Sequence, residues 1–130
     1  MGQQQLLLLV LAAVIVGTGI LLGVNMFQDN AAQANLDAVT QDCLTLASRA
    51  QAWYRRPLAL EGGGQAFTGI NLAELNFTSP NENGTYTFTV APATLTITGD
   101  GLEDGDGTAG NVKVVVTVTN NAVTTDVQNR

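Results

Sequence analysis

Residues 6–27 read LLLLVLAAVIVGTGILLGVNMF, a run of 22 residues without a charged side chain. As a helix this run would span about 33 Å, at about 1.5 Å per residue, which is enough to cross the hydrocarbon core of a bilayer. After Asp29 the sequence changes to patterns that are typical of a water-soluble domain. The chain is therefore expected to join an apolar N-terminal helix to a small soluble part.

The segment that follows, residues 29–56, predicts an amphipathic helix, because its apolar residues recur at steps of three and four. These residues are Leu36, Val39, Cys43, Leu46, Ala50 and Trp53. Pro57 marks the expected end, since the residue before a proline is disfavoured in helical geometry. No strong breaker separates the two segments. We therefore expect one long helix over residues 1–56, in which residues 1–28 protrude as an apolar spike and residues 29–56 pack on a soluble head.

Residues 57–130 form the expected head, and their Thr-rich alternation of apolar and polar residues predicts four short strands. The strands are expected at 85–90, 94–98, 112–118 and 122–127. Tyr86, Phe88 and Val90 share one face of the first strand, and the Asn-Asn pair at 120–121 fits a two-residue hairpin turn. Further apolar residues expected to face inward are Leu95, Ile97, Val112, Val114, Val116 and Val118. The prediction is an α+β fold, with a long helix packed on a small antiparallel sheet.

Length and composition limit the classes of function. Once the spike is set aside, about 100 residues remain, which is enough for one small domain. Eleven acidic residues against five basic ones give a net charge of −6, and no basic stripe is present, so nucleic acid is not an expected partner. A single cysteine, Cys43, cannot form an intrachain disulfide, so packing or assembly must stabilise the head.

The first residues carry a family resemblance. Gly-Gln-Gln-Gln at 2–5, followed by the apolar residues 6–17, resembles the N-terminus of type IV pilin-like proteins. In that family a prepilin peptidase removes a short leader after a glycine, and the apolar helix then holds the subunit in the cytoplasmic membrane. The resemblance implies a structural subunit that later polymerises through this helix into an extracellular type IV pilus-like filament on the cell surface. The implied partners are identical subunits, membrane lipid, the peptidase and the pilus assembly machinery.

The resemblance and the apolar pattern together assign a polymerisation core to the spike. Its expected residues are Gln5, Leu6, Leu7, Leu9, Val10, Val14, Ile15, Gly17, Gly19, Gly23 and Phe27. Gly19 and Gly23 stand four residues apart, a spacing that lets two helix backbones approach closely. The three glycines also weaken the helix by about 1 kcal/mol each relative to alanine. We expect them to permit bending or local unwinding on assembly, which a segment that only spans lipid does not need.

The sequence departs from the family at one position. Many such pilins carry a glutamate at the fifth mature residue, whereas Gln5 holds that place if Met1 is the mature start, and Leu7 holds it if cutting follows Gly2. Neither register supplies a carboxylate. The amides of residues 3–5 can pair between neighbouring subunits, or they can lie in the lipid headgroup region as a hydrated helix start. Both alternatives stay open.

Other interpretations of the N-terminal segment and of the whole chain also stay open. Residues 32–34 read Ala-Gln-Ala, as in a signal-peptide cleavage site, although the apolar run is longer than such signals usually have. The alternatives to a filament subunit are a membrane-anchored β-domain that binds a partner as a monomer and a minor pseudopilin of a secretion system. Residues 1–48 contain no Lys or Arg, the residues that normally orient a membrane anchor, and this favours assembly over simple anchorage.

No enzyme is expected, because the chain has no His, two Ser and no phosphate-binding glycine loop from which a catalytic site could be assembled. The best candidate for chemistry is the loop 99–107, where Asp100, Asp104 and Asp106 alternate with glycine. Several carboxylates on a sharply turning loop suit calcium, so these three residues are a candidate calcium site. The alternative is an ordinary acidic turn, because the spacing is not that of an EF-hand loop. No other cofactor is expected.

Two tripeptides match the acceptor pattern for N-linked glycosylation. Asn76 begins Asn-Phe-Thr and Asn83 begins Asn-Gly-Thr, both just before the first predicted strand. The tripeptide is frequent by chance, so each asparagine is a candidate acceptor whose alternative is an ordinary loop residue.

Overall fold

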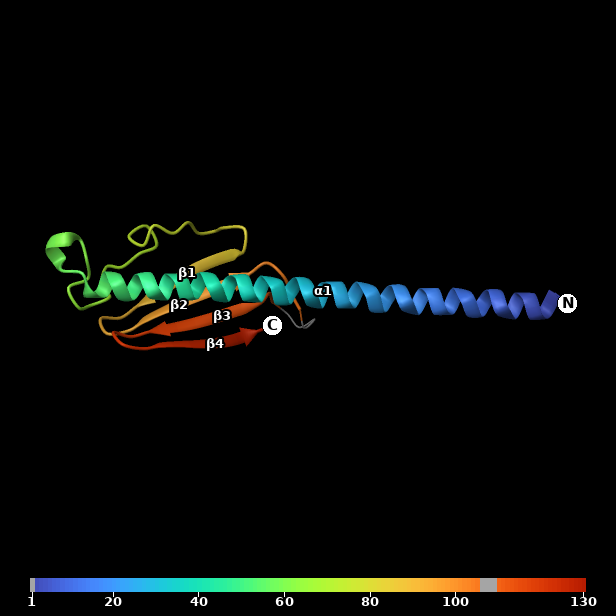
Figure 1. Ribbon diagram of the computed structural model, residues 1–130. Coiled ribbons are helices and arrows are strands. Elements are labelled where there is room, and N and C mark those ends of the chain that lie inside the picture. Colours follow the sequence, from blue (N-terminus) through green and yellow to red (C-terminus); the bar gives the residue numbers. More distant parts are fainter. Residues whose placement is uncertain (1, 106–109) are drawn as a thin grey trace.

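In the computed structural model, which describes residues 2–105 and 110–130, one helix runs through more than a third of the chain (Figure 1). This helix, α1 (Gly2–Arg55), is followed by a short 3-10 helix, η1 (Leu58–Leu60), and by a loop that leads to the sheet. The strands are β1 (Gly84–Val90), β2 (Leu95–Gly101), β3 (Lys113–Val118) and β4 (Val123–Asn129). The predicted α+β fold, a long N-terminal helix on an antiparallel sheet, is confirmed.

The sheet is an antiparallel meander in the order β1-β2-β3-β4. Its register places Phe88 opposite Ile97, Ile97 opposite Val116, and Val116 opposite Thr125. The predicted turn at 120–121 is present, because the amide of Thr119 donates to the carbonyl of Ala122 at 2.9 Å across two intervening residues. Short connections and strict alternation explain why the strands follow one another in space as they do in sequence.

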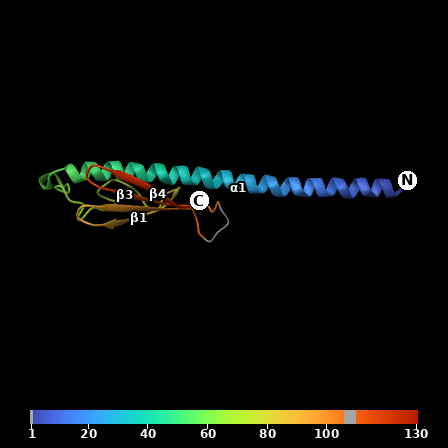
Figure 2. The same ribbon diagram turned by 90° about the horizontal axis from the view of Figure 1, so that it is seen from below.

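The two halves of α1 have different surroundings. Figures 1 and 2 show the N-terminal half extending alone beyond the sheet, while the C-terminal half lies along it. Every described spike residue, 2–28, is exposed, and burial begins at Ala32. At about 1.5 Å per residue the 54-residue helix is about 80 Å long, which is far more than a small head needs.

The core lies between the C-terminal half of α1 and the inner strands β2 and β3. The buried residues of α1 are Ala32, Leu36, Val39, Cys43, Leu46, Ala47, Ala50 and Trp53. The six residues expected to face inward from the later strands, Leu95, Ile97, Val112, Val114, Val116 and Val118, are all fully buried. Gly99 lets the helix approach, since an added Cβ there would lie 2.6 Å from Val39 Cγ1 and 2.8 Å from Cys43 Sγ. The predicted helix stripe is therefore the packing face.

One prediction about the first strand is only partly right. Tyr86 is buried and Phe88 is half-buried, but Val90 is 41% exposed, although alternation places all three on one face. The reason is the extent of the covering layer. The helix covers β2 and β3, whereas β1 is an edge strand that loop residues cover only in part, with Phe77 packing edge-on against Tyr86 at a ring-centroid distance of 5.1 Å. Val90, at the end of β1, lies beyond this cover.

Candidate functional site

The spike is the largest unpaired apolar surface that the structure describes. Its large exposed side chains are Leu6, Leu7, Leu8, Leu9, Val10, Leu11, Val14, Ile15, Val16, Ile20, Leu21, Leu22, Val24, Met26 and Phe27. They surround the helix on all sides, so no single face can be buried by folding onto the head. Soluble monomers rarely expose contiguous apolar patches larger than a few hundred Å², and larger patches mark sites of interaction with proteins or membranes. The spike is therefore the candidate functional site.

By length and composition α1 can cross a membrane, and none of its apolar window is buried inside the protein. An apolar helix near the N-terminus is a feature shared by membrane spans and signal sequences. These properties are compatible with association of this segment with a membrane and with its use as a signal.

The residues predicted to form the polymerisation core, including Gln5, all lie on this exposed half of α1. The glycines among them have no packing role within the chain, because a Cβ added at Gly17, Gly19 or Gly23 would meet nothing within 4 Å. Helix-weakening residues that serve no intramolecular contact leave room for close approach by another helix. The helix is continuous through all three positions.

Sequence reasoning missed how Thr18, between two of these glycines, is accommodated. Its hydroxyl lies 3.1 Å from the carbonyl oxygen of Val14 and 3.0 Å from that of Ile15, so it donates back into its own helix. This bond satisfies the hydroxyl without water, as lipid or a packed helix bundle requires. The sequence feature that could have predicted this bond is a threonine inside an apolar helix, because its hydroxyl can reach the backbone carbonyl four residues earlier.

A polar cluster around Asp42 connects the C-terminal half of α1 to β1 and to the loop before it. One carboxylate oxygen of Asp42 accepts hydrogen bonds from the amides of Asn81 at 3.1 Å and Asn83 at 2.8 Å, and from the Tyr86 hydroxyl at 2.6 Å. Burial alone would raise the pKa of Asp42, but the three donors outweigh it and hold this pKa below its ordinary value. The pKa of Tyr86 is raised, first by burial and then by its bond to Asp42. The cluster thus joins the loop and β1 to the helix.

The two candidate glycosylation asparagines lie in different environments. Asn83 is half-buried in the Asp42 cluster, and its side-chain nitrogen, the atom that would carry a glycan, donates to Asp42. Asn76 is exposed, with a left-handed backbone conformation at φ 51°, and its carbonyl accepts from Arg49 at 3.2 Å. Of the two, Asn76 therefore has the acceptor nitrogen that is accessible in the folded head.

The candidate calcium residues are placed only in part. Asp100 lies on β2 with one carboxylate oxygen 3.6 Å from Lys113 Nζ, Asp104 lies in the following loop, and Asp106 lies outside the described residues. Within residues 2–105 and 110–130, no group of three acidic, His or Cys side chains is arranged to hold a metal ion. Calcium binding by this loop stays a prediction.

Cys43 packs against Gly99 in the core and is buried. Burial, followed by the negative charges of Asp42 and Asp100, raises the pKa of its thiol to about 12. The protonated thiol therefore acts as a small apolar side chain at neutral pH.

Comparison of the chain with protein-family models, with curated protein sequences and with solved structures finds no match. The likeness to pilin-like proteins rests on the N-terminal residues and on the shape, a long apolar helix packed on a small antiparallel sheet. This shape fits a pilin-like subunit and a membrane-anchored module alike.

Proposed function

We propose that this protein is a structural subunit that polymerises through its apolar spike into an extracellular type IV pilus-like filament. One observation carries the proposal: an entirely exposed apolar helix is continuous with the helix that forms the core of the head. A free spike in water is unfavourable, and parallel packing of many spikes buries it while leaving every head outside.

The size of the apolar surface supports a cohesive polymer. About 20 apolar side chains, at about 1.5–3 kcal/mol each when fully buried, far exceed the cost of association for one subunit in water. When the spike moves from lipid into a helix bundle, the gain in free energy from burying apolar side chains is smaller. Close packing of small residues between helices then stabilises the assembly. Gly17, Gly19 and Gly23, free of contacts within the chain, supply such a surface.

The proposal includes partners and a location. Before assembly the spike lies in the lipid of the cytoplasmic membrane, where a prepilin peptidase and the assembly machinery act on the subunit. After assembly its partners are identical subunits in a helical homopolymer at the cell surface. The protein has a structural role and no catalytic one, and either a major subunit or a minor pseudopilin fits this description.

A membrane-anchored head that acts as a monomer is the second candidate, since the spike is long enough to span a bilayer. Anchorage alone requires length and apolarity. It does not require the helix-weakening glycines of the spike, and it is normally accompanied by flanking cations, which residues 2–48 lack. These two features favour the polymer.

The test is to shear intact cells, pellet the released material, and examine it by electron microscopy and by mass spectrometry of the N-terminal peptide. The proposal expects thin uniform fibres that contain this chain as the main protein, and the peptide defines the mature first residue. If wild-type cells release no fibres and the chain stays in the membrane fraction, the anchored monomer replaces the polymer.

A matched pair of variants sharpens this test. Leu9→Asp places a charge on the spike at a side chain that is 68% exposed, and Leu58→Asp places the same charge on the head at one that is 75% exposed. Leu9→Asp is expected to abolish fibres, because a carboxylate in a helix bundle lacks a partner, while Leu58→Asp is expected to leave them intact. Normal fibres from Leu9→Asp would refute polymerisation through the spike.

A further inference from the structure

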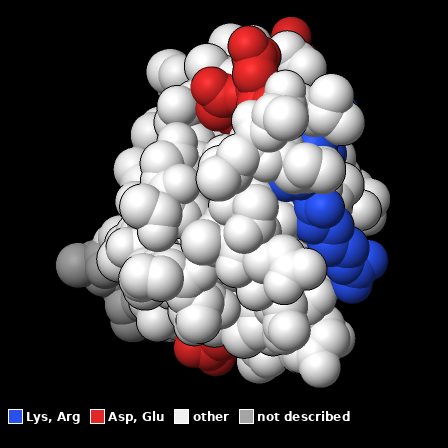
Figure 3. Space-filling view, turned by 90° about the vertical axis from the view of Figure 1, so that its left-hand side faces the viewer, with Lys and Arg blue, Asp and Glu red and all other residues white. Residues whose placement is uncertain are grey.

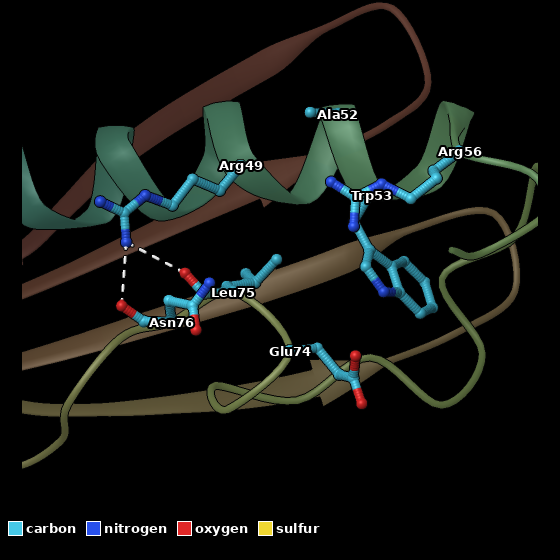
Figure 4. Close-up of a pocket in the computed structure, with 7 residues that line it drawn as sticks. All are labelled: Arg49, Ala52, Trp53, Arg56, Glu74, Leu75 and Asn76. Atoms are coloured by element: carbon cyan, nitrogen blue, oxygen red, sulfur yellow. Dashed lines mark hydrogen bonds between the residues drawn. The ribbon is translucent and has the colours of Figure 1, made fainter. Parts of the chain in front are cut away.

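The end of the head farthest from the spike carries a pocket of about 340 Å³. We call this end the distal end and the end next to the spike the proximal end. The pocket lies between the last turns of α1 and the segment 74–76 (Figure 4). Its polar lining consists of Arg49, Trp53, Arg56, Glu74 and Asn76.

The indole of Trp53 is the unusual member of this lining. The side chain is 6% exposed, and its Nε1 has no acceptor anywhere in the described parts of the chain. The six-membered ring packs on Gly63, where an added Cβ would lie 2.5 Å from Cζ3, and Figure 4 shows the Nε1 edge on the side of Glu74. A buried N–H group without an acceptor is rare and unfavourable, so an oxygen placed beside Nε1 would be stabilised.

Two arginines supply positive charge beside this unpaired donor. Arg49 is held by a single nitrogen, Nη1, which lies 3.0 Å from the carbonyl of Leu75 and 3.2 Å from that of Asn76. This leaves its other guanidinium nitrogens available. Arg56 makes no side-chain hydrogen bond or ion pair with any residue that the structure describes. Figure 4 shows Arg49 and the indole of Trp53 pointing toward segment 74–76, and the Arg56 side chain running back along the end of the helix above Trp53.

The charges select the class of ligand. Two arginines against Glu74 give the lining one net positive charge, which suits a group with one negative charge. Guanidinium groups match the geometry of carboxylates, which accept two parallel N–H bonds from one arginine. The indole N–H adds a third donor. A carboxylate can therefore accept from one arginine and from the indole N–H at the same time.

We infer that the distal pocket binds a carboxylate of a second copy of this chain, presented by the proximal end of the neighbouring head, with Glu103 as the residue that enters. This inference rests on the proposed polymer. Because each chain carries its spike at one end only, parallel spikes place all heads in the same direction, so a contact between consecutive heads along the filament axis joins the distal end of one to the proximal end of the next. The pocket then links consecutive heads outside the spike core.

The distribution of charge supports this contact. Residues 49–74 at the distal end contain three of the five basic residues, and Figure 3, viewed from that end, shows basic side chains gathered in one strip. The proximal end is rich in carboxylates, and Glu103 is exposed there, with its backbone amide 3.3 Å from the Asn35 side-chain oxygen. Asn35 and Arg49 are separated by fourteen residues, so they lie on one face of α1, and Arg56 follows directly after the end of this helix. The acid and the pocket thus lie along the same side of the head.

The test uses full-length protein in cells and in sheared fibres. Arg56→Glu and Glu103→Arg are each expected to lower the fraction of chain recovered as fibres by about tenfold, and the double variant is expected to restore it, because the pair is re-formed with reversed charges. Arg55→Glu is the matched control: Arg55 lies outside the pocket and donates to the carbonyl of Asn120 at 3.1 Å, so fibre recovery is expected to stay within about twofold of wild type.

Trp53 provides a direct readout, since it is the only tryptophan of the chain. Its emission maximum is expected to differ between detergent-solubilised subunits and fibres, and this difference is expected to disappear in fibres of Arg56→Glu. Wild-type fibres together with unchanged recovery and unchanged emission in Arg56→Glu would overturn the pocket contact while leaving the polymer intact. Absence of wild-type fibres would instead overturn the polymer. If acetate shifts the emission of solubilised subunits while both charge variants assemble normally, the occupant is a free carboxylate and the second-copy contact is wrong.

Discussion

The two halves of α1 share one backbone conformation but differ in what stabilises them. From Ala32 onward, the helix buries one stripe against β2 and β3 and leaves the opposite side polar, as in most globular domains. Residues 2–28 are all exposed, and from Leu6 to Phe27 large apolar side chains surround the helix. Isolated helices of this length gain little from propensity alone in water, so the spike depends on lipid or other subunits for its environment. A helix can therefore be half domain core and half interaction surface without a break.

The largest difference between the two halves of α1 is expected when the same charged residue is introduced into each of them. Val39 is fully buried, so Val39→Asp leaves an unpaired carboxylate in the core and is expected to cost at least about 4 kcal/mol, enough to unfold the head. Val14→Asp is expected to prevent fibres while changing the stability of the head by less than about 0.5 kcal/mol. Thermal unfolding of the full chain in detergent measures the first effect, and sheared fibres measure the second. Equal loss of head stability in both variants would contradict the division of α1 into a core half and an exposed interaction half.

Deleting apolar volume tests the same contrast without charge. Leu46→Ala, at a fully buried position, is expected to cost about 2–5 kcal/mol through lost contacts and a cavity. Leu22→Ala, in the spike, is expected to leave the melting of the head unchanged, because its side chain is exposed and touches no part of the head. Denaturant unfolding followed by circular dichroism of the sheet compares the two, and a destabilised head in Leu22→Ala would show that spike and head are coupled.

The Asp42 cluster separates the head from the spike in a second way, because it makes the stability of the head depend on pH. The pKa of Asp42 is lowered in the folded state, so its contribution is complete above the unfolded value of 3.8 and is lost as the pH falls through the lower folded pKa. Asp42→Ala is expected to cost about 1–3 kcal/mol at neutral pH, because three donors lose their acceptor. Unfolding curves from pH 7 to pH 2 check this: the gap between variant and wild type should narrow at the acid end. A constant gap would exclude the carboxylate as its source.

Replacing a glycine by alanine is expected to have the smallest effect on stability, and the effect is expected to have opposite signs in the spike and in the head. Gly23→Ala adds a Cβ that meets nothing within 4 Å, so it is expected to stabilise the free spike helix by about 1 kcal/mol while weakening assembly. Gly99→Ala places a Cβ 2.6 Å from Val39 and is expected to destabilise the head by about 1–2 kcal/mol. Helicity in detergent, head melting and fibre recovery distinguish the two, and improved assembly of Gly23→Ala would show that close backbone approach is not needed there.

The features that were predictable from sequence are those with a local period. The spike, the buried stripe of α1 and the inward valines of β3 all follow from apolar spacing within a single element. The exposure of Val90 was not predictable, because alternation gives the direction of a side chain and not the extent of the layer above it. The fold class was correct because these local patterns leave only one way to bury both faces.

The polar sites were beyond sequence reasoning. Asp42 meets Asn81 and Asn83 across 39 and 41 residues, and the two asparagines lie in a loop without periodicity. The unpaired nitrogen of Trp53 is visible only once its neighbours are placed, since the sequence marks this residue as one more member of the apolar stripe. Contacts between an irregular loop and a helix depend on the path of the loop, which no propensity encodes.

Because α1 is unbroken, the orientation of the spike inside an assembly also fixes the angle at which the head points outside it. With about 3.6 residues per turn, each residue added between spike and head turns the sheet by about 100° around the helix axis and lifts it by about 1.5 Å. An insertion of one alanine after Gln28 therefore aims the head in a new direction without altering either half, whereas an insertion of seven returns it to within about 20° of its starting angle. The length of this helix, counted in single residues, sets which side of each head its neighbours meet.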